Sequence, residues 1–291
     1  VAVTLIFNNY WNYGGWINVF GVILYSIQLY ADFSGGIDIT IGIAQMFGIT
    51  MDENFRQPYF SRSISEFWRR WHITLGTWMK DYIFYPFSLS RCMNKFGKWC
   101  KKTFGNNVGK LLPVSLANLL VFFIVGIWHG AAWKYIMYGM YNGVIIAASG
   151  MLAPVYARIH ESLHINPKSW WYQVFCIIRT FILVNISWYF DNAATLTDAF
   201  RLIGNTFKHA SFSMDAVVKM SGSQLDLIIL LVGCFVWLII SILKEKGIVI
   251  REALDRKPLI IRWAVYIALV MSVAMLGYIS NTSGGFMYAQ F

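Results

Sequence analysis

The stretch "LLPVSLANLLVFFIVGIW", residues 111–128, carries no charged side chain and only two polar side chains, Ser115 and Asn118. A helix of about 20 mostly apolar residues crosses the hydrocarbon core of a bilayer. Five further stretches are also mostly apolar, with at most one charged side chain each: residues 16–30, 132–152, 170–190, 225–243 and 259–279. Residues 37–50 are apolar but shorter, which predicts a half-span or a re-entrant helix. The sequence therefore predicts an all-α polytopic membrane protein, with about six to seven transmembrane or half-membrane helices in one domain over residues 1–291.

The overall composition points to lipid as the solvent. The chain is 57% hydrophobic and 13% charged, whereas soluble domains carry about 25% charged residues. The net charge of +10 is better explained by loops that face anionic lipid than by a nucleic-acid partner. We therefore expect membrane lipid, and not nucleic acid, as a partner.

Lysine and arginine residues orient the predicted spans. Residues 91–110 contain six basic residues and no acidic one, residues 244–262 contain six more, and residues 280–291 contain none. Because cytoplasmic loops are enriched in Lys and Arg, we expect the two basic loops to be cytoplasmic. This orientation places His129 near the outer end of its helix and His72 toward the inner side.

The stretch "SISEFWRRWHITLGTWMKDYIFYPF", residues 63–87, combines charged and aromatic side chains. Ser63 and Glu66 have the spacing of a capping box, which predicts a helix that starts near Ile64 and ends at Pro86. Aromatic and apolar residues recur at helical spacing on one face: Trp68, Trp71, Leu75, Trp78, Tyr82 and Tyr85. Such a helix is typical of the membrane interface.

His72 lies within this predicted interfacial helix and has two interpretations. It is either an incidental polar residue of a membrane anchor, or a group that faces a water-accessible cavity and titrates or donates a hydrogen bond. The preceding loop, residues 51–63, is polar and contains Arg56. That loop fits either a phosphate or pantetheine group or lipid headgroups.

The run "QLYADFSGGIDITIG", residues 28–42, places Asp32 and Asp38 in an apolar context. Its double glycine predicts a break in the helix, and broken helices at membrane depth line cavities. A buried carboxylate requires a partner. A structural ion pair with a nearby arginine is favoured over direct catalysis; the available arginines are Arg56, Arg62, Arg69 and Arg70.

The run "FFIVGIWHGAAW", residues 122–133, sets His129 between Trp128 and Gly130 at the end of an apolar helix. One interpretation is a histidine that interacts with the helix dipole, followed by a glycine stop. The other is a neutral general base, because histidine has an ordinary pKa near 6.5. Asn142 and Tyr138 on the next helix are candidates to orient the ring or bind substrate.

No metal site is predicted. His160 and His164 lie one helical turn apart, but no third ligand is near in the sequence, as a zinc site requires. The four cysteines have neither paired nor metal-like spacing, and we expect them to be structural or incidental.

Taken together, these runs resemble the membrane-bound O-acyltransferase superfamily. The closest similarity is to its bacterial branch of alginate O-acetylation, peptidoglycan O-acetylation and teichoic-acid D-alanine transfer proteins. Two weaker runs also fit: "RTFILVNISWYFDNAATLTDAF", residues 179–200, and "GGFMYAQF", residues 284–291. The resemblance further implies that spans of the family precede residue 1.

The resemblance implies a reaction and roles for individual residues. An activated acyl group, acetyl in our expectation, would pass from a cytoplasmic thioester to a hydroxyl of a cell-surface polysaccharide. The thioester, either acetyl-CoA or an acyl carrier, is a substrate, and no bound cofactor is expected. The catalytic residues would be His129 and His72. We expect substrate to contact six residues: Arg56, Arg69, Arg70, Trp71, Trp128 and Asn142. Three acidic residues would support the site: Asp32, Asp38 and Glu66.

The resemblance also implies a cellular setting. The protein would lie in the bacterial cytoplasmic membrane and work with an extracytoplasmic esterase-like transferase. Two departures from the family pattern leave the acceptor open: Gly36–Ile37 after the "DFSG" run, and residues 190–193, "FDNA". D-alanyl transfer to teichoic acid from a carrier protein is the alternative reaction, and transport of an acyl carrier without chemistry is the alternative from another class.

Overall fold

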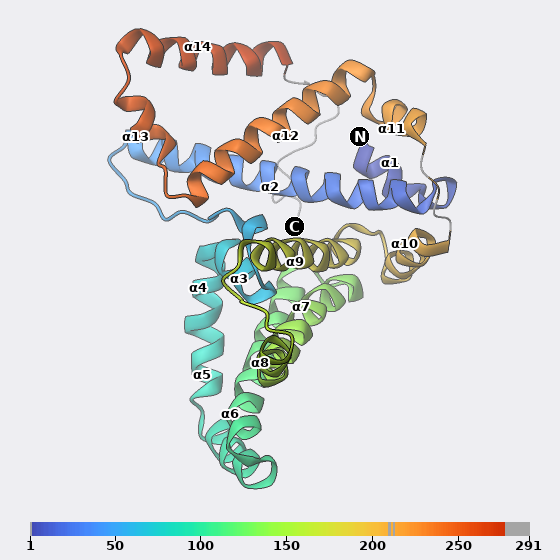
Figure 1. Ribbon diagram of the computed structural model, residues 1–291, viewed down its shortest axis with the longest axis vertical. Helices are drawn as coiled ribbons and strands as arrows, with labels where there is room; N and C mark the ends of the chain where they lie inside the picture. Colours follow the sequence, from blue (N-terminus) through green and yellow to red (C-terminus); the bar gives the residue numbers. More distant parts are fainter. Residues whose placement is uncertain (1, 209–210, 212, 277–291) are drawn as a thin grey trace. The chain divides into compact units, whose positions relative to one another are not determined.

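The computed structural model describes residues 2–208, 211 and 213–276. The chain forms two compact units, residues 3–212 and residues 213–290, the second together with the first two residues. Each unit is described by itself. The described residues contain helices and no strand, as the composition predicts (Figure 1).

The first unit carries the predicted site. Its helices, in chain order, are α1 (Ala2–Asn8), η1 (Tyr10–Asn12), α2 (Gly15–Met46), η2 (Pro58–Phe60), α3 (Ile64–Arg70), α4 (Ile73–Met79), η3 (Lys80–Phe84), α5 (Tyr85–Ser88), α6 (Arg91–His129), α7 (Trp133–Met151), α8 (Ala153–Ser162), α9 (Trp170–Asn192) and α10 (Leu196–Lys208).

Helix α2 corrects the predicted break at the double glycine. It runs without interruption from Gly15 to Met46 and absorbs the predicted half-span 37–50 up to Met46. A glycine inside a helix costs only about 1 kcal/mol relative to alanine. The cost of two glycines is smaller than the free energy that favours continuing the long apolar helix, because each residue added to an existing helix forms one more backbone hydrogen bond.

The predicted single helix over residues 64–86 is in fact broken at His72. The helix start and the Ser63 cap are confirmed, because the Ser63 side chain accepts a hydrogen bond from the Glu66 backbone N–H at 3.1 Å. The reciprocal bond of a capping box is shifted by one residue, since the Glu66 carboxylate accepts from the Arg62 backbone N–H at 2.9 Å. However, α3 ends at Arg70, His72 adopts left-handed backbone angles, and a new helix starts at Ile73. Pro86 lies in the first turn of α5 rather than at a helix end, a position where its missing N–H costs nothing.

Helix α6 contains a reversal that the sequence did not predict. Gly105 has φ 80° and ψ 172°, a conformation open essentially to glycine alone. A Cβ atom on Gly109 would lie 2.4 Å from the backbone of Lys101, so the chain folds back on itself there. Residues 91–104 and 106–129 are therefore two arms of a helical hairpin.

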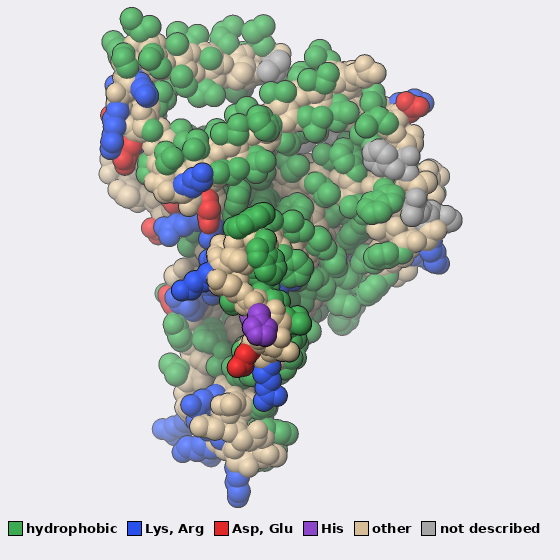
Figure 2. Space-filling model, in the orientation of Figure 1, with side chains coloured by type: hydrophobic (Ala, Val, Ile, Leu, Met, Phe, Trp, Pro, Cys, Tyr) green, Lys and Arg blue, Asp and Glu red, His purple; other side chains and the backbone are tan. Residues whose placement is uncertain are grey.

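The predicted basic loop, residues 91–110, is thus helical, and it forms the tip of this hairpin. Its exposed lysines are Lys95, Lys98, Lys101, Lys102 and Lys110. Figure 2 shows Lys and Arg gathered over this end of α6.

The second arm of α6 packs closely against α7. A Cβ atom on Gly139 would lie 2.1 Å from the Phe122 carbonyl oxygen, and one on Gly126 would lie 2.6 Å from the Tyr135 carbonyl oxygen. The backbones of the two helices therefore approach closely at Gly126 and Gly139. Helix α8 continues from α7 after a bend of 56°, and α9 packs against both α7 and α2.

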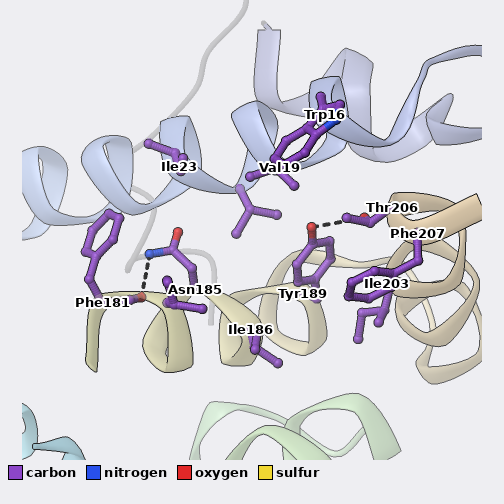
Figure 3. A pocket seen from close by; sticks show the side chains of 12 residues that line it. Trp16, Val19, Ile23, Phe181, Asn185, Ile186, Tyr189, Ile203, Thr206 and Phe207 are labelled. Carbon is purple, nitrogen blue, oxygen red and sulfur yellow. Dashed lines mark hydrogen bonds between the residues drawn. The ribbon is translucent and has the colours of Figure 1, made fainter. Parts of the chain in front are cut away.

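An apolar cavity of about 380 Å³ lies between α2, α9 and α10 (Figure 3). Its walls include Trp16 and Ile186. Its few polar groups bond to one another or to the backbone: Tyr189 and Thr206 share a hydrogen bond of 3.2 Å, and Asn185 donates to the Phe181 carbonyl at 2.8 Å.

The second unit consists of α11 (Met214–Ser221), α12 (Gln224–Glu245), α13 (Ile250–Asp255) and α14 (Leu259–Leu276). Helix α12 matches the predicted span 225–243, and α14 matches the described part of the span 259–279. Residues 277–279 and the predicted C-terminal loop, residues 280–291, lie outside the described residues.

By length and composition, four described helices are able to cross a membrane: α2, α6, α9 and α12. The bent pair α7–α8 would make a fifth. Helix α14 is apolar but shorter. An all-helical, multi-pass membrane protein is the class that this architecture defines.

Candidate active site

His129 lies at the C-terminal end of α6 and is 6% exposed. Its ring is enclosed by the rings of Trp128, Tyr135 and Tyr138, whose centroids lie 5.0, 6.1 and 5.1 Å away. Gly130 ends the helix with φ 150°, and a Cβ atom there would lie 2.7 Å from the Tyr135 ring. The glycine stop is therefore what allows Tyr135 to close over the histidine.

A carboxylate from another helix faces this ring. Asp191, near the C-terminal end of α9, is 5% exposed, and its Oδ1 lies 3.9 Å from His129 Nδ1. The Tyr25 hydroxyl of α2 donates to Asp191 Oδ2 at 2.6 Å. Lys134 Nζ donates to the backbone carbonyls of Asp191 and Ala193 at 3.1 and 2.8 Å. Three helices thus fix the carboxylate beside the imidazole.

The arrangement suits proton transfer. A separation of 3.9 Å is too long for a hydrogen bond, but catalytic hydrogen bonds are often long before substrate binds. Because Nδ1 faces Asp191, Nε2 is the ring nitrogen to which a proton-transfer role with a substrate would fall. A carboxylate beside an imidazole favours the protonated ring that such a transfer creates.

His72 is placed by a strand-like pairing of two loops. Phe55 and Trp71 form an antiparallel bridge, the Ile73 N–H donates to the Asn54 carbonyl, and the Arg56 N–H donates to the Arg70 carbonyl. The backbone of His72 has φ 47°. A left-handed conformation is uncommon for residues other than glycine, and strain of this kind concentrates at functional sites.

Hydrogen bonds determine the tautomer of His72. Asn54 Oδ1 accepts from the Thr74 N–H at 3.2 Å and from the Thr74 hydroxyl at 2.7 Å. It lies 3.0 Å from His72 Nδ1, so Nδ1 carries the proton and Nε2 is the basic nitrogen. Burial, and to a smaller extent the nearby His129, lower the pKa of His72 to about 4. At neutral pH the ring is therefore neutral, with the proton on Nδ1 and the lone pair on Nε2.

The expectation that the two histidines lie at different depths is wrong. The ring centroid of Trp128 lies 6.0 Å from that of His72 and 5.0 Å from that of His129. Figure 1 shows α4 and α5 running beside α6, with α5 at the end nearer to the basic hairpin. Both imidazoles therefore belong to one site.

Two further predicted residues are largely buried next to this site. Asn142 is fully buried, accepts a hydrogen bond from Trp68 Nε1 at 3.1 Å and donates to the Tyr138 carbonyl. Trp71 is 2% exposed and stacks on Phe67, which makes it part of the core. By contrast, Trp128 is 44% exposed and lies between the two histidines.

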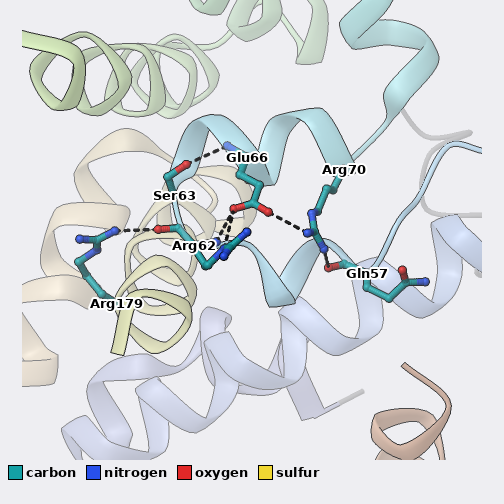
Figure 4. Close-up of polar contacts among 6 residues, drawn as sticks. All are labelled: Gln57, Arg62, Ser63, Glu66, Arg70 and Arg179. Carbon is teal, nitrogen blue, oxygen red and sulfur yellow. Dashed lines mark hydrogen bonds and ion pairs between the residues drawn. The ribbon is translucent and has the colours of Figure 1, made fainter. Parts of the chain in front are cut away.

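The predicted arginines are mostly engaged with acidic residues (Figure 4). Glu66 pairs with Arg70 at 2.8 Å and with Arg62 at 3.7 Å. Arg56 is exposed and pairs with Glu53 at 3.4 Å, and exposed Arg69 donates to the Ser65 hydroxyl. Glu66 thus holds two arginines near the start of α3, and its predicted role in supporting the site stays a prediction.

Asp32 and Asp38 lie on the continuous helix α2, where Asp32 is half-buried and Asp38 is exposed. Their predicted supporting role stays a prediction.

Sequence reasoning missed Asp191 and Tyr25. Asp191 was noticed only as a departure from the family pattern. A signal was present, because an ionisable residue at the end of an apolar span marks a functional site by default. No comparable signal existed for Tyr25, whose contact with Asp191 joins residues 166 positions apart.

The fold and the site together define a polytopic helical membrane protein with a buried histidine–aspartate pair. Residues 6–187 match the family described as MBOAT, membrane-bound O-acyltransferase. The chain belongs to this family, as its sequence motifs predict. The match contains α2 to α8 and most of α9, and it includes both histidines.

Three named relatives show the range of the similarity. A probable alginate O-acetylase of Pseudomonas syringae is 34% identical over 213 residues, which cover 73% of this chain and 36% of the relative. A peptidoglycan O-acetyltransferase of Helicobacter pylori is 34% identical over 62% of this chain and 29% of the relative. A teichoic acid D-alanyltransferase of Bacillus subtilis is 32% identical over 57% and 38%. The chain thus spans between 29% and 38% of the length of these three relatives.

Proposed function

We propose that this protein is an O-acyltransferase that moves an acyl group, acetyl in our proposal, from a thioester donor to a hydroxyl of a cell-surface polysaccharide or of its transfer partner. One observation carries the proposal: His129 is enclosed by aromatic rings and faces the buried carboxylate of Asp191 at 3.9 Å. The family supports acyl transfer, and the names of the relatives supply the acceptor class and the acetyl group.

In the proposed step His129 acts as the general base. Nε2 takes the proton of the acceptor hydroxyl while the hydroxyl oxygen attacks the thioester carbonyl carbon. The C–S bond then breaks, and the departing sulfur receives the proton from the imidazolium. Asp191 stabilises the transient positive charge on the ring, and the Tyr25 hydrogen bond fixes the orientation of Asp191. Base catalysis of this kind contributes about 10²- to 10⁴-fold to a rate.

The surroundings protect the donor from hydrolysis. The aromatic rings around His129 exclude water, which would otherwise compete with the acceptor for the thioester. His72 lies on the other side of Trp128 with a fixed tautomer. We propose that its Nε2 accepts a hydrogen bond from the substrate or takes part in proton transfer.

The remaining features of the proposal concern the setting. The donor is acetyl-CoA or an acyl carrier that approaches from the basic, cytoplasmic side. The protein lies in the bacterial cytoplasmic membrane and works with an extracytoplasmic esterase-like transferase. D-alanyl transfer, the second candidate reaction, differs in acyl group, donor and acceptor. The similarity to the B. subtilis teichoic acid D-alanyltransferase supports it.

The test is an assay of surface O-acyl esters in cells that carry the complete protein. His129→Ala is expected to lower ester formation by about 10²-fold or more at an unchanged protein level, and His72→Ala is expected to lower it as well. Mass spectrometry of the acid released from the surface distinguishes acetate from D-alanine. Normal ester levels in His129→Ala would refute the mechanism, and movement of an acyl carrier without ester formation would favour the transport alternative.

A further inference from the structure

A second cavity, of about 420 Å³, lies in the first unit where α3, α6, α7, α8 and α9 meet. Its polar lining residues include Ser115, Asn118, Ser149, Arg179 and Thr180. Most of the other lining residues are aliphatic, and no residue that lines the cavity is acidic. This cavity is not used by the mechanism proposed above.

Thr180 shows that the cavity is suited to a polar ligand. The residue is 2% exposed, and its hydroxyl has no hydrogen-bond partner among the described residues. A buried hydroxyl is almost always hydrogen-bonded in a native protein, so an exception calls for an explanation. A ligand in the cavity would supply the missing partner.

Arg179 contributes a positive charge and has more N–H donors than the one that bonds the Arg62 carbonyl. Its Nη2 donates to the Arg62 carbonyl at 2.8 Å (Figure 4). A guanidinium has five N–H donors in a planar fork that matches a phosphate group. Whereas Arg62 and Arg70 pair with Glu66, Arg179 has no carboxylate partner among the described residues. It therefore remains able to bind an anion.

The position of the cavity indicates the side from which a ligand enters. Leu111, which lines it, follows directly after the basic hairpin tip at Lys110. Ile146 lies near the same end of α7, two helical turns beyond Tyr138, which contacts His129. The cavity thus lies toward the basic end of the unit, about 12 Å along α7 from that tyrosine.

We propose that this cavity binds a phosphate ester carried by an amphipathic molecule. The phosphate pairs with Arg179, the Thr180 hydroxyl and its neighbours bond the polar part, and the aliphatic lining residues pack against hydrocarbon. Two sources carry this chemistry: the headgroup of an anionic phospholipid, and the phosphopantetheine arm of a thioester donor. Only the second source depends on the proposed function.

The test measures binding rather than turnover, so loss of acyl transfer does not affect its outcome. The complete protein is placed in phosphatidylcholine nanodiscs. In one arm, phosphatidylglycerol is added to the nanodiscs and retained lipid is counted by native mass spectrometry. In the other arm, coenzyme A is titrated. Both arms compare the unaltered protein with Arg179→Gln and with Thr180→Val, which preserves shape and removes only the hydroxyl.

Arg179→Gln is expected to weaken binding about 10- to 100-fold, and Thr180→Val about 2- to 10-fold, because a charge-assisted hydrogen bond contributes more than a neutral one. Lys110→Gln is the matched control for general attraction at the basic end, and Thr103→Val, on the exposed hairpin, is the control for loss of a hydroxyl. Neither control is expected to weaken binding by as much.

Each outcome of these measurements either supports or overturns the proposed phosphate site. A defect in phosphatidylglycerol retention alone identifies a lipid site, a defect in coenzyme A binding alone identifies the donor arm, and a defect in both supports a shared phosphate site. The proposal is overturned if the unaltered protein binds neither probe, or if Lys110→Gln has the same effect as Arg179→Gln. Should Arg179→Gln fail to fold, unchanged binding by Thr180→Val is sufficient to reject it.

Discussion

Under the proposed function, Asp191 orients and stabilises His129 and does not itself contact the bond that breaks. Its carboxylate lies between Tyr25 and His129, and both partners are buried. A buried carboxylate is costly unless it is hydrogen-bonded, so its retention at the end of an apolar helix is consistent with a role in the reaction. We expect the charge of Asp191 to contribute more to the reaction than the hydrogen bond that it accepts from Tyr25.

Asp191→Asn and Tyr25→Phe test this order. Asp191→Asn keeps the size of the side chain but removes the charge that stabilises protonated His129, and we expect acyl transfer to fall about 10- to 100-fold. Tyr25→Phe removes one hydrogen bond to the carboxylate and should lower the rate about 3- to 10-fold. Both rates are measured as ester formation per molecule of folded protein. Equal rates in Asp191→Asn and the unaltered protein would remove Asp191 from the site.

His72 gives a prediction about pH. Burial lowers its pKa in the folded protein to about 4, whereas an exposed histidine titrates near 6.5. Between these values the unfolded state binds the extra proton, so stability decreases as pH falls from about 6.5 toward 4. Above pH 6.5 the ring is neutral in both states, and His72 contributes no pH dependence there.

The matched variant is His72→Asn, because asparagine tolerates left-handed backbone angles and does not titrate. The thermal midpoint of the unaltered protein in detergent should fall more steeply than that of His72→Asn as pH is lowered from about 7 to about 5. The difference in unfolding free energy is limited to about 3 kcal/mol by the size of the shift. Parallel curves for the two proteins would show that His72 does not carry this dependence.

At the scale of helices, the crossing of α6 and α7 holds Tyr138 against His129. Gly139→Ala would bring a Cβ atom within 2.1 Å of the Phe122 carbonyl oxygen, so the two helices must separate. We expect a loss of about 1–3 kcal/mol in stability and reduced acyl transfer, because Tyr138 moves with α7. Thermal unfolding and ester formation are the measurements.

Gly204→Ala in α10 is the control for this prediction. Nothing lies within 4 Å of a Cβ atom at that position, so the substitution should be neutral or should stabilise the helix by up to about 1 kcal/mol. If both variants unfold at the same temperature, the close approach of α6 and α7 does not limit stability.

Helices were predicted well where composition alone determines them, and poorly where tertiary contacts intervene. The spans in α6, α7, α9 and α12 follow from apolar length. The break at His72 depends instead on Asn54, which is distant in sequence and bonds the ring. The reversal at Gly105 was hidden because a basic stretch is expected in a loop. Likewise, the two histidines stood out in the sequence, but only the packing of α2 and α9 reveals Asp191 as the carboxylate beside His129.

At the scale of the whole protein, the direction in which the helices cross the membrane matters for the proposed reaction. It determines the side of the membrane from which the donor and the acceptor would each reach His129. In the first unit, the second arm of α6 leads from the basic hairpin to His129, and α9 ends at Asp191 beside it. The catalytic pair therefore lies at the ends of two helices, away from the hairpin. If the hairpin is cytoplasmic, an extracytoplasmic acceptor has the shorter approach to His129, and the donor must pass from the basic side.

A native cysteine makes this orientation measurable. Cys92 is exposed on the basic hairpin, whereas Cys100 and Cys176 are buried and Cys234 is half-buried. A membrane-impermeant maleimide should label Cys92 in inverted membrane vesicles and not in intact cells, because loops rich in Lys and Arg stay on the cytoplasmic side.

The opposite end of the second arm of α6 is probed by Ala131→Cys in a Cys92→Ser background, since Ala131 is exposed directly after Gly130. That cysteine should be labelled from outside the cell. Cys92→Ser alone controls for labelling of the remaining cysteines. Labelling of both positions from the same side would mean that the second arm of α6 does not cross the membrane, and the separate routes for donor and acceptor would then be wrong even if His129 proved essential.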